Sequence, residues 1–215
     1  MRFRSPARLS PTTILAAVAG SAALAYTAYE LYSMFAAEQQ PDYTRVLSPP
    51  SELTYYPSSG TLKLSAAQEQ AKSVIMSLAQ SKAAPRFGNL WIPFAQGLVA
   101  NAYGESKLNP AAVGDSGRAY GLFQLNFARP DALGSQALKY YSKQQLFDPA
   151  VNAGFFIDTC LKTSQVVAAI QSGDAYRCSD AITRYVERPK NIETDSATRK
   201  KYLTAIFGPQ SARVA

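Results

Sequence analysis

Two neighbouring stretches of the chain decide its fold. Residues 105–112 read Glu-Ser-Lys-Leu-Asn-Pro-Ala-Ala, and residues 117–126 read Gly-Arg-Ala-Tyr-Gly-Leu-Phe-Gln-Leu-Asn. The first stretch closes a helix predicted over residues 93–106, because Pro110 cannot continue a helix. The second follows glycines that break helical periodicity, and its run Ala-Tyr-Gly-Leu-Phe-Gln-Leu is typical of a short strand. We therefore expect a helix that leads into a small, irregular β element.

A glutamate lies on the core-facing side of the predicted helix. Phe94, Leu98 and Ala102 form an apolar stripe, and Glu105 continues it in the last turn. Burial disfavours a charged carboxylate, and so does the carboxyl end of a helix dipole, so we expect a raised pKa for Glu105. Such a group suits the protonation of a glycosidic oxygen near neutral pH. The stripe alone leaves open that Glu105 only pairs with an arginine at the helix end.

Both stretches together resemble the lysozyme superfamily. Soluble lytic transglycosylases have a Glu-Ser pair, an Asn-Pro-x-Ala step and a Gly-Leu-Met-Gln segment. Animal lysozymes have Glu-Ser, Asn-Thr-x-Ala and Asp-Tyr-Gly-x-x-Gln-Ile-Asn. Shorter matches are the Asp-Pro-x-x-Asn of residues 148–152, found in transglycosylases, and residues 187–189, similar to a Glu-x-Pro ending in phage tail lysozymes. The resemblance implies an α+β, mostly helical lysozyme-like domain that cuts the β-1,4 bond between N-acetylmuramic acid and N-acetylglucosamine in peptidoglycan.

The resemblance also assigns roles to individual residues. Glu105 would donate a proton to the leaving oxygen, while Gly121 would let the backbone approach the glycan and Gln124 would offer its amide to sugar hydroxyl or acetamido groups. The residues expected to bind substrate are Ser106, Tyr120, Gly121, Gln124 and Tyr185. The alternative is a structural role, as turn or strand scaffold for Gly121 and Gln124 and as a core aromatic for Tyr185.

The second carboxylate of the lysozyme reaction is missing from its aligned position. That aspartate falls on Ala119, where lytic transglycosylases also have alanine, and these enzymes use the N-acetyl group of the substrate to form a 1,6-anhydro product. Ala119 therefore favours a lytic transglycosylase. Arg118, however, replaces the glycine that usually precedes this alanine, and Asp115 could activate water as in an inverting hydrolase. The sequence leaves the cleavage mode open.

The residue inventory excludes several other chemistries. The chain has no histidine and only two cysteines, so a Ser-His-Asp triad, a Cys-His dyad and the histidine-bearing zinc sites of amidases cannot form. This argues against a muralytic peptidase, and we expect no metal and no organic cofactor. A non-catalytic wall-binding or virion structural protein on the same fold remains a second hypothesis, against which the intact Glu105 argues.

The rest of the domain is predicted to be mostly helical. A first helix begins after Ser65, because Ser65 and Gln68 form a capping box and Ala67, Ala71, Val74, Ile75 and Leu78 share one face. Later helices are predicted over residues 130–141, 149–163, 174–186 and 196–207. A disulfide between Cys160 and Cys178 is expected if the domain lies in an oxidising compartment, although spacing alone does not bring the two thiols together.

The first 60 residues differ from the rest. Arginines precede a stretch, residues 9–29, that contains no charge, and a proline-rich segment follows. We expect a transmembrane anchor over residues 1–38 with its N-terminus in the cytoplasm, a Pro/Ser/Tyr-rich linker over 39–60 and the lytic domain over 61–215 outside the cytoplasm. A cleaved signal peptide is the alternative, since Ala23-Leu24-Ala25 offers a small-x-small site.

The charge excess lies in the predicted lytic domain. Basic and acidic residues are balanced before Gly60, whereas 18 basic residues face 11 acidic ones from Thr61 onward. A basic surface attracts polyanions, and we expect the anionic wall rather than nucleic acid as its partner, with the membrane contacted through the N-terminal helix. Such enzymes act in phage virions or beside bacterial secretion machines; the sequence does not decide between these, nor does it identify protein partners.

The anchor hypothesis predicts where the native protein begins. An uncleaved chain should start at or near Met1 and stay with membranes in high salt or carbonate. N-terminal sequencing of protein from its native source tests this, and a mature start just after Ala25 would identify a signal peptide instead.

Overall fold

The computed structural model describes residues 60–209. The predicted anchor and, apart from Gly60, the predicted linker lie outside these residues. The described elements are α2 (Ala66–Phe87), η2 (Gly88–Leu90), α3 (Trp91–Ser106), β1 (Val113–Gly114), β2 (Ala119–Tyr120), β3 (Leu125–Asn126), α4 (Leu133–Ala137), η3 (Gln145–Phe147), α5 (Pro149–Lys162), α6 (Ser164–Gln171), α7 (Ala175–Ile182), η4 (Thr183–Glu187) and α8 (Ile192–Phe207). Among them, no helix combines the length and apolar character that crossing a bilayer requires. The mostly helical α+β fold is as expected.

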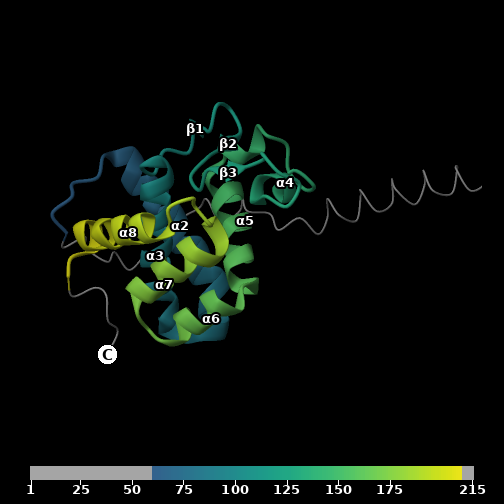
Figure 1. Cartoon of the computed structure of the whole chain (residues 1–215). Helices are drawn as coiled ribbons and strands as arrows, with labels where there is room; N and C mark the ends of the chain where they lie inside the picture. Colours follow the sequence, from purple (N-terminus) through teal and green to yellow (C-terminus); the bar gives the residue numbers. More distant parts are fainter. Residues whose placement is uncertain (1–59, 210–215) are drawn as a thin grey trace, which may run out of the picture. The chain divides into compact units, whose positions relative to one another are not determined.

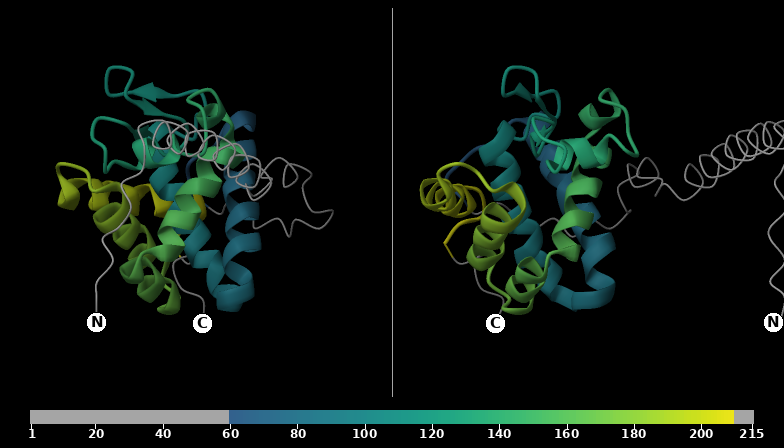
Figure 2. Two further views of the ribbon diagram at one scale, coloured as in Figure 1. Left: turned by 90° about the vertical axis from the view of Figure 1, so that its right-hand side faces the viewer. Right: turned by 45° about the vertical axis from the view of Figure 1, so that its right-hand side comes forward.

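Helix α3 is the central element of the domain. Every residue from 93 to 102 is buried, and α2, α7 and α8 all pack against the helix. A helix that is covered on all sides has to be apolar all round, which explains its run of Phe, Ala, Leu and Val. The strands and α4 lie together at one end of the helical body, and α6 lies at the other (Figure 1; two further views in Figure 2).

The predicted capping box of the first helix is confirmed. The Ser65 hydroxyl accepts from the Gln68 N–H at 3.3 Å, and the Gln68 side chain accepts from the Ser65 N–H at 2.9 Å. Both bonds satisfy N–H groups that the first turn would otherwise leave without a partner. Ala71, Ile75 and Leu78 are buried as expected, whereas Ala67 is exposed, so the apolar face begins one turn later than predicted.

The β element consists of three two-residue strands rather than the one short strand predicted over residues 119–125. The strands are antiparallel in the order β1-β2-β3, with Val113 opposite Tyr120 and Ala119 opposite Asn126. The predicted strand is interrupted by a turn at residues 121–124, where Gly121 has φ 78° and Gln124 has φ 43°. Such positive φ angles cannot continue an extended strand.

One buried side chain on α5 holds this turn in place. The Asn152 carbonyl accepts from the Phe123 N–H at 3.0 Å, and its amide donates to the Tyr120 and Leu146 carbonyls at 3.1 and 3.0 Å. Asp148 caps the same helix by accepting from two of its first N–H groups. The Asp-Pro-x-x-Asn pattern therefore starts α5 and ties it to the β element.

The other predicted helices differ from the structure mainly at their ends. Helices α5 and α7 occur where expected, but α4 is shorter than the predicted 130–141, and residues 183–187 form the π-helix η4 instead of continuing α7. Helix α8 begins at Ile192 rather than 196, because Glu193 and Asp195 favour its first turn through the helix dipole. Helix α6 was not predicted, since only the extended Thr163 separates it from α5.

The predicted disulfide is not present in the structure. Cys160 and Cys178 are both free, and both are fully buried. Each thiol packs as a small apolar side chain in the core. Burial also raises the pKa of both thiols, that of Cys178 to about 12.

Removing the Asn152 side chain should destabilise the domain. Asn152→Ala removes the bonds to one buried N–H, one buried carbonyl and one partly buried carbonyl, and we expect the free energy of unfolding to fall by roughly 3 kcal/mol. Denaturant unfolding measures it. The matched control is Asn191→Ala, at an exposed position with no side-chain cap bond, which should change stability by less than about 0.5 kcal/mol. Equal effects of both substitutions would contradict this role of Asn152.

Candidate active site

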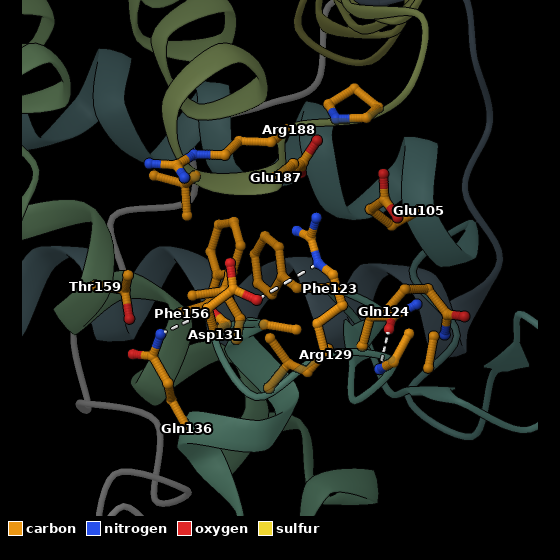
Figure 3. Close-up of a pocket in the computed structure, with 18 of the residues that line it drawn as sticks. Glu105, Phe123, Gln124, Arg129, Asp131, Gln136, Phe156, Thr159, Glu187 and Arg188 are labelled. Atoms are coloured by element: carbon orange, nitrogen blue, oxygen red, sulfur yellow. Dashed lines mark hydrogen bonds and ion pairs between the residues drawn. The ribbon is translucent and has the colours of Figure 1, made fainter.

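A pocket of about 740 Å³ separates the β element from the η4 segment. Figure 3 shows Glu105, Glu187 and Arg188 on its upper side and Gln124, Arg129 and Asp131 on its lower side. Its lining comprises Glu105 from α3, Asp115, Ala119 and most of residues 123–136 around the strands and α4, Phe156, Thr159 and Thr163 around α5, and residues 185–190. Side chains from four separate parts of the chain thus meet at one cleft.

Glu105 reaches the pocket because α3 ends immediately after it. Lys107 and Leu108 both adopt left-handed backbone conformations, with φ 55° and 59°, and these stop the helix at Ser106. Left-handed residues commonly end helices, although glycine is the usual residue there. The side chain of Glu105 is 23% exposed, so it borders the pocket from a nearly buried position, as its place on the apolar stripe predicted.

Arg199 lies directly against Glu105. Its Nη2 donates to Glu105 Oε1, and its side chain is only 6% exposed. Helix α8 brings this arginine close to α3, and Gly104 makes the approach possible, because a Cβ on Gly104 would collide with the guanidinium group. The ion pair between Glu105 and an arginine, which the sequence left open as an alternative, is therefore present. The same Glu105 carboxyl group also lines the pocket.

Glu187 is a second buried carboxyl group beside the same arginine. Its side chain is 6% exposed, and its Oε2 lies 3.6 Å from Arg199 Nη2, which is too far for a hydrogen bond. Within residues 60–209, neither carboxyl oxygen of Glu187 has a hydrogen-bond partner. Buried polar groups are rarely left in this state, and exceptions concentrate at functional sites.

The surroundings of the two carboxyl groups raise both of their pKa values. Burial raises the pKa of Glu105, whereas Arg199 lowers it. For Glu187, burial together with the neighbouring Glu105 carboxylate raises the pKa to about 8, despite the opposing effect of Arg199. Two carboxyl groups that both lie beside one cation cannot ionise independently, so Glu105 and Glu187 titrate as a coupled pair.

A buried polar network connects the two elements that carry these carboxyl groups. Asn101, one turn before Glu105, accepts from the Thr183 hydroxyl at 2.8 Å and donates to the Ser179 hydroxyl at 3.1 Å. Thr183 opens the π-helix η4, whose last residue is Glu187. The network fixes the start of η4 against α3, and π-helical turns often occur at functional sites.

Asp115 also lines the pocket, in an ionised and well-held state. Its carboxylate accepts from the Asn126 amide at 2.6 Å and from Arg118 at 3.1 Å. The bond from Asn126 is the main reason that the pKa of Asp115 is lowered. Asn126 is opposite Ala119 in the sheet, and Ala119 lines the same pocket. Ala119, which is aligned with the lysozyme aspartate, and Asp115, the alternative carboxylate, thus both line this cleft.

The structure separates the other predicted site residues into two groups. Gln124 and Tyr185 line the pocket, and Tyr185 is 42% exposed. The Gln124 amide, however, donates to the backbone carbonyls of Ala112 and Gly121. Ser106, Tyr120 and Gly121 are not among the lining residues. The Ser106 hydroxyl donates to the Leu122 carbonyl, the Tyr120 hydroxyl donates to the Gly117 carbonyl, and a Cβ on Gly121 would collide with Asn152.

Sequence reasoning did not identify Glu187 and Arg199 as site residues. Glu187 was within a recognised Glu-x-Pro pattern, which could have drawn attention to it. Arg199 lies in an α8 sequence with several charged residues, and nothing in that pattern distinguishes it from its exposed neighbours. Only the packing of α8 against α3 reveals that it is buried.

The phage tail lysozyme family model matches residues 92–207. The chain belongs to this family. The match begins in α3, ends with α8, and includes Glu105, Asp115, Glu187 and Arg199. Family membership assigns the domain a lysozyme-like, peptidoglycan-lytic role in general terms. No curated protein and no solved structure matches the chain.

Proposed function

We propose that this domain cleaves the β-1,4 bond between N-acetylmuramic acid and N-acetylglucosamine in peptidoglycan, with Glu105 as the general acid. The observation that carries the proposal is the Glu105 carboxyl group, which borders the pocket while its surroundings are buried enough to raise its pKa. A raised pKa keeps a carboxyl group protonated closer to neutral pH, as an acid for glycosidic oxygen requires. The family match supports the substrate class.

For the fate of the sugar cation, we favour a lytic transglycosylase. Once Glu105 has protonated the leaving oxygen, positive charge develops at C1 of the muramic acid. Ala119 provides no carboxylate in the pocket to capture it. The acetamido oxygen of the substrate would then attack C1, and the C6 hydroxyl would displace it while Glu105 takes up the proton. The product would carry a 1,6-anhydro end.

A hydrolytic muramidase is the second candidate, because Asp115 is an ionised carboxylate in the same pocket. An inverting hydrolase needs such a group to activate water on the opposite face of the sugar. The hydrogen bond from Asn126 and the ion pair with Arg118 make Asp115 a weaker base. This is why we rank the hydrolase second.

We further propose that the domain acts outside the cytoplasm, tethered to a membrane through the N-terminal segment, where it opens the wall locally. The support is the sequence of residues 1–38 and the basic excess of the domain. Phage tail lysozymes suggest a role in virion penetration, and bacterial secretion systems offer a comparable one.

Replacing the acid should abolish wall lysis without unfolding the domain. In Glu105→Gln the amide has a similar shape but no acidic proton, and the loss of a general acid lowers rates by about 100-fold or more. Arg199 keeps Glu187 as a partner, so we expect the variant to remain folded and to bind walls. Turbidity of wall suspensions, beside a thermal melt and a wall pull-down, measures the three properties. The control is Glu193→Gln, at a glutamate 81% exposed; a folded Glu105→Gln variant that lyses walls like this control would refute the assignment.

Digestion in oxygen-18 water distinguishes the two cleavage modes. A transglycosylase should release 1,6-anhydro ends without label, and Asp115→Asn should keep most activity. Label at the new C1, together with loss of activity in Asp115→Asn, would establish the hydrolase instead.

A further inference from the structure

The cluster of Glu105, Glu187 and Arg199 contains two acidic groups and one cation, all largely buried. With both carboxyl groups ionised the cluster would carry a net negative charge, which is unfavourable at such a buried position. With one proton shared between the two carboxyl groups, its charge is balanced. We therefore expect the cluster to retain a single proton near neutral pH.

The contacts of Arg199 favour this proton on Glu187, whereas catalysis needs it on Glu105. Arg199 donates directly to Glu105, an arrangement that favours the ionised form of Glu105. Glu187, which has no hydrogen-bond partner within residues 60–209 and stays buried, is the group that the geometry leaves protonated. An acid catalyst needs the opposite distribution.

We propose that Glu187 is a positioning residue that stores the catalytic proton, and that Arg199 exchanges Glu105 for Glu187 as its partner when glycan enters the cleft. The inference rests on the proposed function. The Glu187 carboxyl group loses a proton to water in the cleft, the Glu105 carboxylate gains one, and the total charge is unchanged. Sugar in the cleft removes water from the partly exposed Glu105 and so disfavours its charged form.

The packing allows this exchange with a small movement. Arg199 Nη2 already lies 3.6 Å from Glu187 Oε2. Gly104 leaves the guanidinium group its space, and Arg199 Nε has no hydrogen-bond partner in the described part of the chain. Three side chains on three separate elements therefore form a two-position switch.

Other charged or titratable groups also act on the cluster. Asp195 raises and Lys107 lowers the pKa of Glu105, and Asp195 also raises that of Glu187. Cys160 is close enough to Glu187 for the carboxylate to raise the pKa of its thiol, which is held neutral by burial. Glu187 is the acidic group that shares Arg199 with Glu105.

The test is the pH dependence of wall lysis by Glu187→Gln. Without a stored proton, Glu105 can be protonated only against the full attraction of Arg199. The basic limb of the lysis profile, which is the fall of the lysis rate at high pH as Glu105 loses its proton, should therefore move to lower pH by about one unit. The variant should fold, because a carboxyl pKa raised by burial from 4.5 to about 8 destabilises the folded state as pH rises through that range, and glutamine removes this effect. Glu187→Asp, which keeps a titratable group, should restore the limb toward its wild-type position.

Glu193→Gln serves as the matched control, since it removes one exposed acidic group nearby and should leave the limb unchanged. A merely structural role for Glu187 would lower lysis equally at all pH values, and that result, or an unmoved limb, overturns the proposal. If Glu187→Gln is folded but inactive throughout, carbon-13 titration of the Glu105 carboxyl group decides: a lower pKa than in wild type supports storage, and an equal one refutes it.

The Glu105→Gln experiment separates this inference from the proposed function. Lysis by a folded Glu105→Gln variant means that Glu105 is not the acid. Lysis lost in Glu105→Gln, together with an unmoved limb in Glu187→Gln, refutes proton storage alone.

Discussion

The candidate site depends on one buried cation. Arg199 projects from α8 between the carboxyl groups of Glu105 and Glu187, with 6% of its side chain exposed. A guanidinium group remains charged at any physiological pH, so burying it requires a negative partner, and two acidic groups compete for that place. In our proposal, this competition determines whether Glu105 is protonated and therefore whether it can act as the general acid.

The scaffold around the cluster is built to hold it. Helix α3 is buried on all sides and ends at the cleft, so Glu105 has a fixed position. Asn101 and Thr183 attach η4 to α3 through buried hydrogen bonds. Asn152 attaches the β element to α5, which places Asp115 and Ala119 at the other side of the pocket. Buried polar side chains, rather than apolar contacts alone, set the relative positions of the site residues.

Much of this arrangement could be predicted from local sequence. The Ser65 capping box, the α3 stripe and the place of Glu105 at its end depend on residues close together in the chain, and all three are confirmed. Other features depend on tertiary packing. The turn at Gly121–Gln124 needs Asn152 from another helix, and the burial of Arg199 needs α8 against α3. That Cys160 and Cys178 are free in the structure also could not be predicted from their spacing.

The most direct test of the central claim is mass spectrometry of the soluble fragments that the wild-type domain releases from purified peptidoglycan. Our account predicts disaccharides that retain intact stem peptides, which shows that a glycosidic bond has been cut and every peptide bond spared. Fragments with newly freed peptide amines and uncut glycan strands would contradict it. It would also be contradicted if the folded protein bound the wall but released no fragment from it.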